Sequence, residues 1–461
     1  MLRDSADWLR EDLWRAHASW LSPPWVGETS ERRGDFDAGR WLDVMQAAGY
    51  QTLIFYVKHH DGFCAYPSRF SNAQPERDFL GECVTEVRRR DMRVLCYYSS
   101  FIDEVTGNEH PDWQVLGRDG QPASVWCSQQ WPGAYCCINN PEYRALLLGQ
   151  LAELRDNYDP DGLWMDVFEP LMGENCFCPS CQSKYRRETG GDIFETQGNA
   201  WYQQCVVQVM EEIKAISQGN DRACIVTANT GKRVRALDEL CDVLTHEAFT
   251  STMISSVGRA LRPLGKPWEI TCRLYSAVGT WAIRGADRVL LESMAAVAHG
   301  GACCQELSPT HTGKITDEAA VRVAEVGQYI RGIEEYLVGT EPVYDAAIVQ
   351  ANSEYGVTTE CPVPGGWHTV MMERDIPFAF VDSDADLSGY RLVILDGRTP
   401  VDEALAQRVA EYVKEGGSLI VEGEVGERLE EALGVTGPHP PAPLSTSGEG
   451  KTATASYPPP S

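Results

Sequence analysis

The segment from Lys58 to Phe63 holds the residues of this sequence that are best placed to do chemistry. It reads Lys-His-His-Asp-Gly-Phe and directly follows the apolar run at 52–57. In parallel α/β architectures, ligands and catalytic groups gather at the carboxyl ends of the strands. Neutral imidazoles there can hydrogen-bond sugar hydroxyls, bind a metal or transfer protons. We therefore expect His59 and His60 to belong to a functional site. The alternative is that both histidines only bond to neighbouring backbone.

Asp166 is a second candidate, because it ends the apolar run at 163–165. A carboxylate at the carboxyl end of a barrel strand projects into the face where active sites form. A helix cap is the alternative, but residues 168–170, Phe-Glu-Pro, do not begin a helix. The sequence therefore predicts a functional carboxylate at Asp166.

A catalytic carboxylate often works with a second carboxyl group whose pKa differs from its own. Three glutamates could be that partner of Asp166. Glu247 follows a predicted strand, Glu269 lies near the start of another, and Glu169 is too close in sequence to face Asp166 easily across a ligand. We expect Glu247 to be the partner that transfers a proton, with Glu169 and Glu269 as alternatives. Burial or a neighbouring carboxylate would keep this partner protonated while Asp166 stays ionised.

Three cysteines, Cys176, Cys178 and Cys181, lie within six residues. This spacing lets one loop wrap around a tetrahedral zinc. A tetrahedral site needs a fourth ligand, and the sequence alone offers both Cys136 and Cys137 for this position. Four thiolates leave no open coordination position, so such a zinc would be structural, and we expect no cofactor for catalysis. Ordinary free thiols are the alternative.

Composition limits the class of protein. The formal net charge of −27 offers no basic field for nucleic acid or for an anionic membrane surface. No run of about 18 apolar residues is present, and the first residues, Met-Leu-Arg-Asp-Ser-Ala-Asp-Trp, lack the apolar stretch of a signal peptide. Sixteen cysteines without a secretion signal indicate reduced thiols. We expect a cytoplasmic protein whose partner is a small molecule or an oligosaccharide.

Short apolar runs alternate with longer amphipathic stretches up to about residue 335, which is typical of repeated β-α units. A helix is expected over 142–157, after an Asn-Asn-Pro start signal. The pattern predicts a (β/α)8 TIM-like barrel over 1–337, with an open doubly wound sheet as the alternative. The expected strands are 52–57, 93–98, 162–166, 223–228, 242–246, 268–273 and 301–305, with 16–21 as a weaker first strand.

A second unit is expected over 341–436. Strands are predicted at 345–350, 392–396 and 418–422, with a helix over 402–415. This alternation indicates a small three-layer α/β domain. From 437 to 461 the chain is rich in Pro, Ser, Thr and Gly, a composition that cannot bury apolar surface, so a disordered tail is expected.

Several of these stretches together resemble the barrel of the α-L-fucosidase family. The resemblance covers roughly residues 36–335, and the His-His-Asp-Gly-Phe element is its most specific part. The similar stretches are Phe36-Asp37-Ala38-Gly39-Arg40-Trp41, Ala48-Gly49-Tyr50, Lys58-His59-His60-Asp61-Gly62-Phe63, Gly162-Leu163-Trp164-Met165-Asp166, Trp268-Glu269-Ile270-Thr271-Cys272 and Gly279-Thr280-Trp281.

The resemblance implies a retaining exo-glycosidase that hydrolyses terminal α-L-fucosides through a covalent glycosyl-enzyme intermediate. Asp166 would be the nucleophile and Glu247, in a stretch similar to the family's acid/base segment, the acid/base. The two histidines of the first motif would bind the sugar, and His17 is similar to a sugar-binding histidine of the family's first strand. Trp164 or Trp281 could present an apolar face to the sugar, although tryptophans in barrels are usually core.

The cysteine pattern resembles the zinc-binding cysteines of certain β-galactosidases. That resemblance implies Cys137 as the fourth ligand, ahead of Cys136 and Cys127. The second unit resembles the flavodoxin-like or amidotransferase-like domain that follows the barrel in some β-galactosidases and fucosidase relatives, where it assists oligomer formation. A homo-oligomer is therefore expected, although this chain stops earlier than that domain usually does.

Three other functions remain open from the sequence. The same chemistry could act on another sugar, such as a galactoside. The barrel could bind glycans without cleaving them, although Asp166 and Glu247 argue for catalysis. A zinc hydrolase could use His59, His60 and Asp61 as ligands, but adjacent strand residues point to opposite faces.

Overall fold

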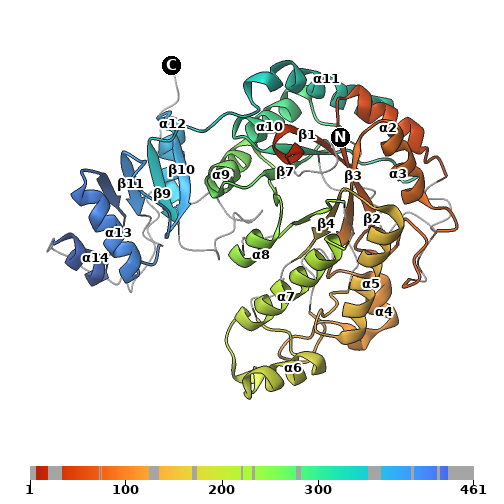
Figure 1. Ribbon diagram of the computed structural model, residues 1–461, viewed down its shortest axis with the longest axis horizontal. Helices are drawn as coiled ribbons and strands as arrows, with labels where there is room; N and C mark the ends of the chain where they lie inside the picture. The colour runs from red at the N-terminus through yellow and green to blue at the C-terminus, as the bar shows by residue number, and fades with distance from the viewer. Residues whose placement is uncertain are drawn as a thin grey trace, which may run out of the picture.

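The computed structural model describes most of the chain, and its elements form a barrel and a smaller second domain (Figure 1). The described residues are 7–18, 34–71, 73, 75–123, 134–168, 174–219, 222–230, 234–276, 282–350, 365–395, 399–422 and 426–434.

Eight parallel strands form the barrel. They are β1 (Trp14–Ala18), β2 (Thr52–Lys58), β3 (Arg93–Ser99), β4 (Gly162–Asp166), β5 (Ile225–Ala228), β6 (Leu244–Glu247), β7 (Trp268–Cys272) and β8 (Ala302–Glu306). Their order is β5-β4-β3-β2-β1-β8-β7-β6. A parallel bridge between Asn229 and Thr245 joins the two remaining edges, and Thr227 Oγ1 donates to the Val243 carbonyl at 2.9 Å. The expected barrel is confirmed, and the open sheet is excluded.

Helices surround these strands. They are α1 (Trp8–Glu11), α2 (Ala38–Ala47), α3 (Phe79–Arg89), α4 (Glu104–Glu109), α5 (Pro141–Tyr158), α6 (Pro179–Thr189), α7 (Ala200–Ser217), α8 (Arg235–Leu240), α9 (Ser251–Leu261), α10 (Ala286–Ala298) and α11 (Asp317–Ile333). Side-chain caps fix where many begin. Asn140, for example, accepts from two amides at the start of α5, where Pro141 fits the first turn.

The barrel interior contains a buried ion pair between Arg15 and Glu269. Glu269 also accepts a hydrogen bond from Trp164 Nε1 at 2.7 Å and one from Thr245 Oγ1 at 2.9 Å. The partners of the Glu269 carboxylate therefore all lie inside the barrel. They supply the opposite charge and the hydrogen bonds that a buried carboxylate needs. This placement agrees with a role for Glu269 deep in the barrel.

The second domain contains a parallel sheet of order β10-β9-β11-β12. Its elements are β9 (Ala346–Gln350), α12 (Gly365–Glu373), β10 (Phe378–Asp382), β11 (Leu392–Leu395), α13 (Glu403–Lys414), β12 (Ser418–Val421) and α14 (Gly426–Leu433). Strand β10 was not among the expected strands. One sheet face packs on α13 and α14, and the opposite face packs on α12 and on Ala260 of barrel helix α9. The three layers agree with the predicted α/β unit, and the tail lies outside the described residues.

Candidate active site

Asp166 ends β4 and faces two hydrogen-bond donors from neighbouring strands. The Tyr97 hydroxyl on β3 donates to Oδ2, and Asn229 Nδ2, just after β5, donates to Oδ1 at 2.9 Å. The next residue, Val167, has a φ of 50°, a conformation that costs a β-branched residue energy and that often occurs at functional sites. The barrel thus holds a buried carboxylate in one orientation at its carboxyl-end face.

Glu247 ends β6 at the same face of the barrel, and Asn229, which donates to Asp166, acts to lower the pKa of Glu247. Burial, and after it the negative charge of Asp166, raise the pKa of Glu247 to about 7. At neutral pH a large fraction of Glu247 therefore carries a proton. A carboxyl group that carries a proton beside a second carboxyl group suits a general acid.

His59 and His60 follow β2, and their ring centroids are 4.2 Å apart. His60 Nδ1 lies 2.7 Å from Ser99 Oγ. Because the Ser99 hydroxyl donates to the Ile102 carbonyl at 2.7 Å, we assign the ring hydrogen to Nδ1 of His60. Nε2, 3.6 Å from Asp166 Oδ2, is then an acceptor. Burial lowers the pKa of His60, which keeps the imidazole neutral.

The turn after β2 is held by the start of α4. Lys58 makes a buried ion pair with Asp103 at 2.5 Å, and Asp103 also caps α4. The amide of Glu104 donates to the His60 carbonyl at 3.0 Å. Gly62 has a φ of 81°, and a Cβ there would lie 2.3 Å from Asp103 Oδ1. The Lys-His-His-Asp-Gly-Phe motif therefore builds a rigid turn that presents the two histidines.

Two expected sugar-binding residues lie deeper in the barrel. His17 on β1 is 2% exposed, neither of its ring nitrogens has a hydrogen-bond partner among the described residues, and burial lowers its pKa to about 4. Trp164 is fully buried, its indole bonds to Glu269, and its ring stacks on Tyr97. This burial argues against a sugar-facing role for Trp164. Trp281 and Glu169 lie outside the described residues.

Four residues of this region were not among the sequence candidates: Tyr97, Asn229, Arg273 and Glu306. Arg273 follows β7 and lowers the pKa of Glu247, whereas Glu306, at the end of β8, raises it. Asn229, Arg273 and Glu306 all lie at or just after strand ends. A search of the sequence for polar residues at the carboxyl ends of the predicted strands could therefore have found them. Tyr97 lies within β3, where sequence does not distinguish it from other buried aromatics.

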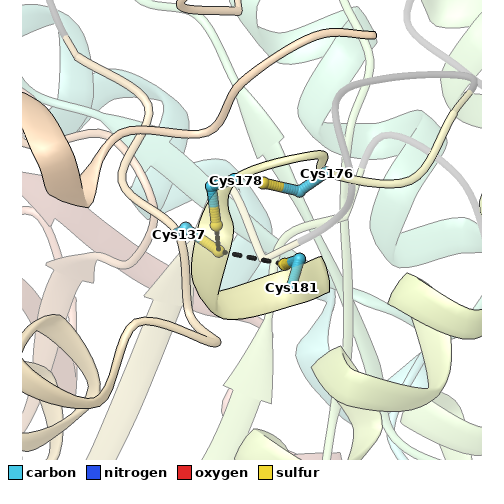
Figure 2. A group of neighbouring side chains, drawn as sticks. All are labelled: Cys137, Cys176, Cys178 and Cys181. Atoms are coloured by element: carbon cyan, nitrogen blue, oxygen red, sulfur yellow. Dashed lines mark hydrogen bonds between the residues drawn. The ribbon is translucent and has the colours of Figure 1, made fainter. Parts of the chain in front are cut away.

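The four cysteines Cys137, Cys176, Cys178 and Cys181 form one buried cluster (Figure 2). All four sulfur atoms lie within 4.8 Å of one another, and Cys137 Sγ is 3.4 Å from Cys181 Sγ and 3.6 Å from Cys178 Sγ. Zinc–sulfur bonds of about 2.3 Å in a tetrahedron require sulfur separations of roughly 3.8 Å. The cluster therefore fits a four-thiolate metal site.

The other thiol candidates lie elsewhere. Cys136 Sγ points to the Asp103 carbonyl at 3.8 Å, and Cys127 lies outside the described residues. Within the described part of the chain, the cysteine cluster is the one group with metal-ligand geometry. His59, His60 and Asp61 do not form a second one, which disfavours the zinc-hydrolase alternative.

Residues 30–335 match the family described as Alpha-L-fucosidase, which is more than half of the chain. The chain belongs to the alpha-L-fucosidase family. The matched segment contains His59, His60, Asp166, Glu247 and the cysteine cluster, whereas His17 precedes it. Residues 357–449 match the family described as Beta-galactosidase trimerisation domain. In the part of the chain that the structure describes, no helix is long and apolar enough to cross a membrane.

Curated relatives match only part of the chain. The tissue alpha-L-fucosidase of Rattus norvegicus is 28% identical over 179 residues, 33% of this chain and 37% of the relative. The plasma alpha-L-fucosidase of Homo sapiens is 30% identical over 138 residues, 28% of this chain and 25% of the relative. The chain thus spans well under half the length of these relatives.

Solved structures resemble the whole arrangement. Alpha-L-fucosidase isoenzyme 2 from Paenibacillus thiaminolyticus has a TM-score of 0.77 at 17% identity, covering 91% of this chain and 65% of that protein. The cold-adapted beta-galactosidase from Rahnella sp. R3 has a TM-score of 0.65 at 16% identity, covering 89% and 71%. At these identities the similarity establishes the fold.

Proposed function

We propose that this chain is a retaining exo-glycosidase that hydrolyses terminal α-L-fucosides through a covalent glycosyl-enzyme intermediate. One observation carries the proposal within the family: Asp166 and Glu247 end two strands of the same barrel at its carboxyl-end face, and the charge of Asp166 raises the pKa of Glu247. The Glu247 pKa of about 7 suits a group that first gives and then takes a proton near neutral pH.

In the first step, the Asp166 carboxylate would attack the anomeric carbon while Glu247 gives its proton to the departing oxygen. In the second, the Glu247 carboxylate would take a proton from water, whose oxygen displaces Asp166 from the sugar. Tyr97 and Asn229 would keep Asp166 aimed at the anomeric carbon. The acceptor Nε2 of His60 supports a hydrogen bond from a sugar hydroxyl.

Hydrolysis of nitrophenyl α-L-fucoside by wild type and by Asp166→Ala tests the proposal. We expect turnover to fall at least about a thousandfold without loss of folding. Added azide should then give a glycosyl azide of inverted configuration. Asp161→Asn is the matched control, because Asp161 directly precedes the same strand and binds the Val94 amide and Arg222. It should lower stability and preserve turnover per folded molecule. Wild-type activity in Asp166→Ala would remove Asp166 from the mechanism.

A galactoside is the second candidate substrate, favoured by the match of residues 357–449 to a beta-galactosidase domain. Parallel rates on nitrophenyl α-L-fucoside and β-galactoside would separate the two. A barrel that binds both sugars and cleaves neither would support the glycan-binding alternative.

We further propose that the cysteine cluster binds one structural zinc. Three of its thiols come from the loop that follows β4 and from the start of α6, while Cys137 precedes α5 (Figure 2). A metal there would tie the segment after Asp166 and the start of α6 to the segment that precedes α5. Its four ligands would leave no position for substrate.

Assembly and location are also proposals. The match to a trimerisation domain supports a homo-oligomer through the second domain, which sedimentation equilibrium would test. Each cysteine of the described residues is unpaired, which supports a reducing compartment such as the cytoplasm. Localisation of a tagged chain in cells would check this.

A further inference from the structure

A cavity of about 490 Å³ lies between the barrel and the second domain. Its barrel side consists of the end of α9, the following turn and residues 298–300 at the end of α10. The opposite side consists of Met371 and Met372 of α12 and of residues 375–377 before β10, and the connector 340–344 closes it. We call it the seam cavity. Because both domains line it, anything bound there contacts both.

Arg259, which lines the seam cavity, has no acidic partner in the described part of the chain. Its Nη1 donates to the Phe378 carbonyl at 2.8 Å, and the guanidinium lies 4.2 Å from the centroid of the Phe378 ring. Nη2 reaches only the Met372 sulfur, at 3.9 Å, and Nε has no hydrogen-bond partner there. Partly buried charges are normally paired with an opposite charge. The Arg259 guanidinium has no such counter-ion among the described residues.

A second guanidinium, that of Arg262, lines the same cavity. It donates to the Gly300 and Thr340 carbonyls. Its nearest carboxylate, Glu341, is 4.0 Å away on a side chain that is 91% exposed. His299 adds no counter-charge, because its Nε2 bonds to Ser255 Oγ. Two arginines thus line a cavity whose described carboxylates, Glu341 and Asp375, are both exposed to solvent, in a chain whose net charge is −27.

Part of the remaining wall is apolar. Met371, Ile376, Pro377 and Val343 line the cavity, together with the polar side chains of Thr340, Tyr344, Glu341 and Asp375. A ligand that fits both features carries an anionic group and an apolar body. We propose that the seam cavity binds a small organic anion, whose phosphate or carboxylate group pairs with Arg259 and Arg262. This site is separate from the Asp166 region and does not depend on the proposed hydrolysis.

Calorimetric titration of the full chain with phenyl phosphate and with benzoate tests the proposal. We expect one saturable site with a dissociation constant below about 1 mM for at least one probe. Preference for phenyl phosphate assigns a phosphate ligand, and preference for benzoate assigns a carboxylate. Arg259→Gln should weaken binding at least about tenfold, while Arg259→Lys, which keeps the charge, should weaken it less.

Arg235→Gln is the matched control. Arg235 also connects the two domains, through an ion pair with Asp384 at 2.6 Å, but it does not line the cavity. Its loss should leave probe binding unchanged, and thermal melting would confirm that each variant is folded. Absence of saturable binding to both probes would overturn the proposal, as would equal binding by wild type and Arg259→Gln.

Discussion

Glu247 carries the clearest prediction at the scale of single residues. If it is the acid/base, Glu247→Ala should slow substrates with poor leaving groups far more than activated aryl fucosides, because only the former require protonation of the departing oxygen. Rates across a series of leaving groups would measure this. Should Glu169→Ala show the leaving-group dependence instead, the acid/base role would pass to Glu169.

Arg273 offers a second residue-scale prediction, through the pH dependence of activity. Burial and Asp166 raise the pKa of Glu247 to about 7, and Arg273 opposes that rise. A general acid must be protonated, so kcat/KM should decline above pH 7. Arg273→Gln should move this basic limb to higher pH, by roughly half a unit to one unit. A limb that stays in place would show that another group controls it.

The candidate site was only partly predictable from single residues. His59, His60, Asp166 and Glu247 stand next to clear strand ends, and the structure places them at one end of the barrel. Tyr97 is different, because it lies within an unbroken buried strand and acquires its role only by facing Asp166 across the strand pair. Periodicity reveals which residues are buried but not which buried hydroxyl meets a carboxylate.

At the scale of elements, the turn that presents the histidines can be tested at Gly62. Gly62→Ala would place a Cβ 2.3 Å from Asp103 Oδ1 at a φ of 81°. We expect a loss of unfolding free energy of about 2–3 kcal/mol, together with lower activity. Gly120→Ala is the matched control, with a φ of 75° and no atom within 4 Å of the added Cβ. It should cost only about 1 kcal/mol. Equal losses in denaturant titrations would mean that the Asp103 contact is unimportant.

The cysteine cluster gives a second prediction at this scale. The purified chain should contain about one zinc, and Cys178→Ser should lose it and melt at lower temperature, because a metal bound only by the folded state stabilises that state. Cys136→Ser changes the neighbouring thiol that points away to the Asp103 carbonyl. It should therefore retain zinc. A metal-free wild type with unchanged stability would reduce the cluster to ordinary thiols.

Most elements of the barrel were predictable because its strands are buried along their whole length. The expected runs at 52–57 and 93–98 correspond to β2 and β3, in which every residue is buried. In the second domain, β10 escaped prediction although the apolar run 378–381 is present. The first strand, expected at 16–21, begins instead at Trp14, because residue pairing with β2 and β8 decides its register.

At the scale of the whole molecule, the contact between the domains was not predictable. An apolar helix face in the sequence indicates that this face is buried, but it does not show which other element packs against it. Helix α9 packs on β10, and its Ala260 joins the core of the second domain. These residues are over a hundred positions apart in the chain, and sequence patterns act over much shorter ranges.

The same contact supplies the prediction for the whole molecule. His368 of the second domain is buried, and its Nε2 lies 2.7 Å from Ser256 Oγ on α9. Burial lowers the pKa of His368 to about 4. Between pH 6.5 and 4 the unfolded chain therefore binds a proton that the folded chain does not, and stability falls as the pH falls. His368→Asn should remove about 1–2 kcal/mol of this pH dependence between pH 6.5 and 4.5, measured by denaturant titration. Ser256→Ala removes the hydrogen bond but keeps the histidine, so it should lower stability and leave the pH dependence in place. An unchanged slope in His368→Asn would show that this histidine does not couple domain contact to pH.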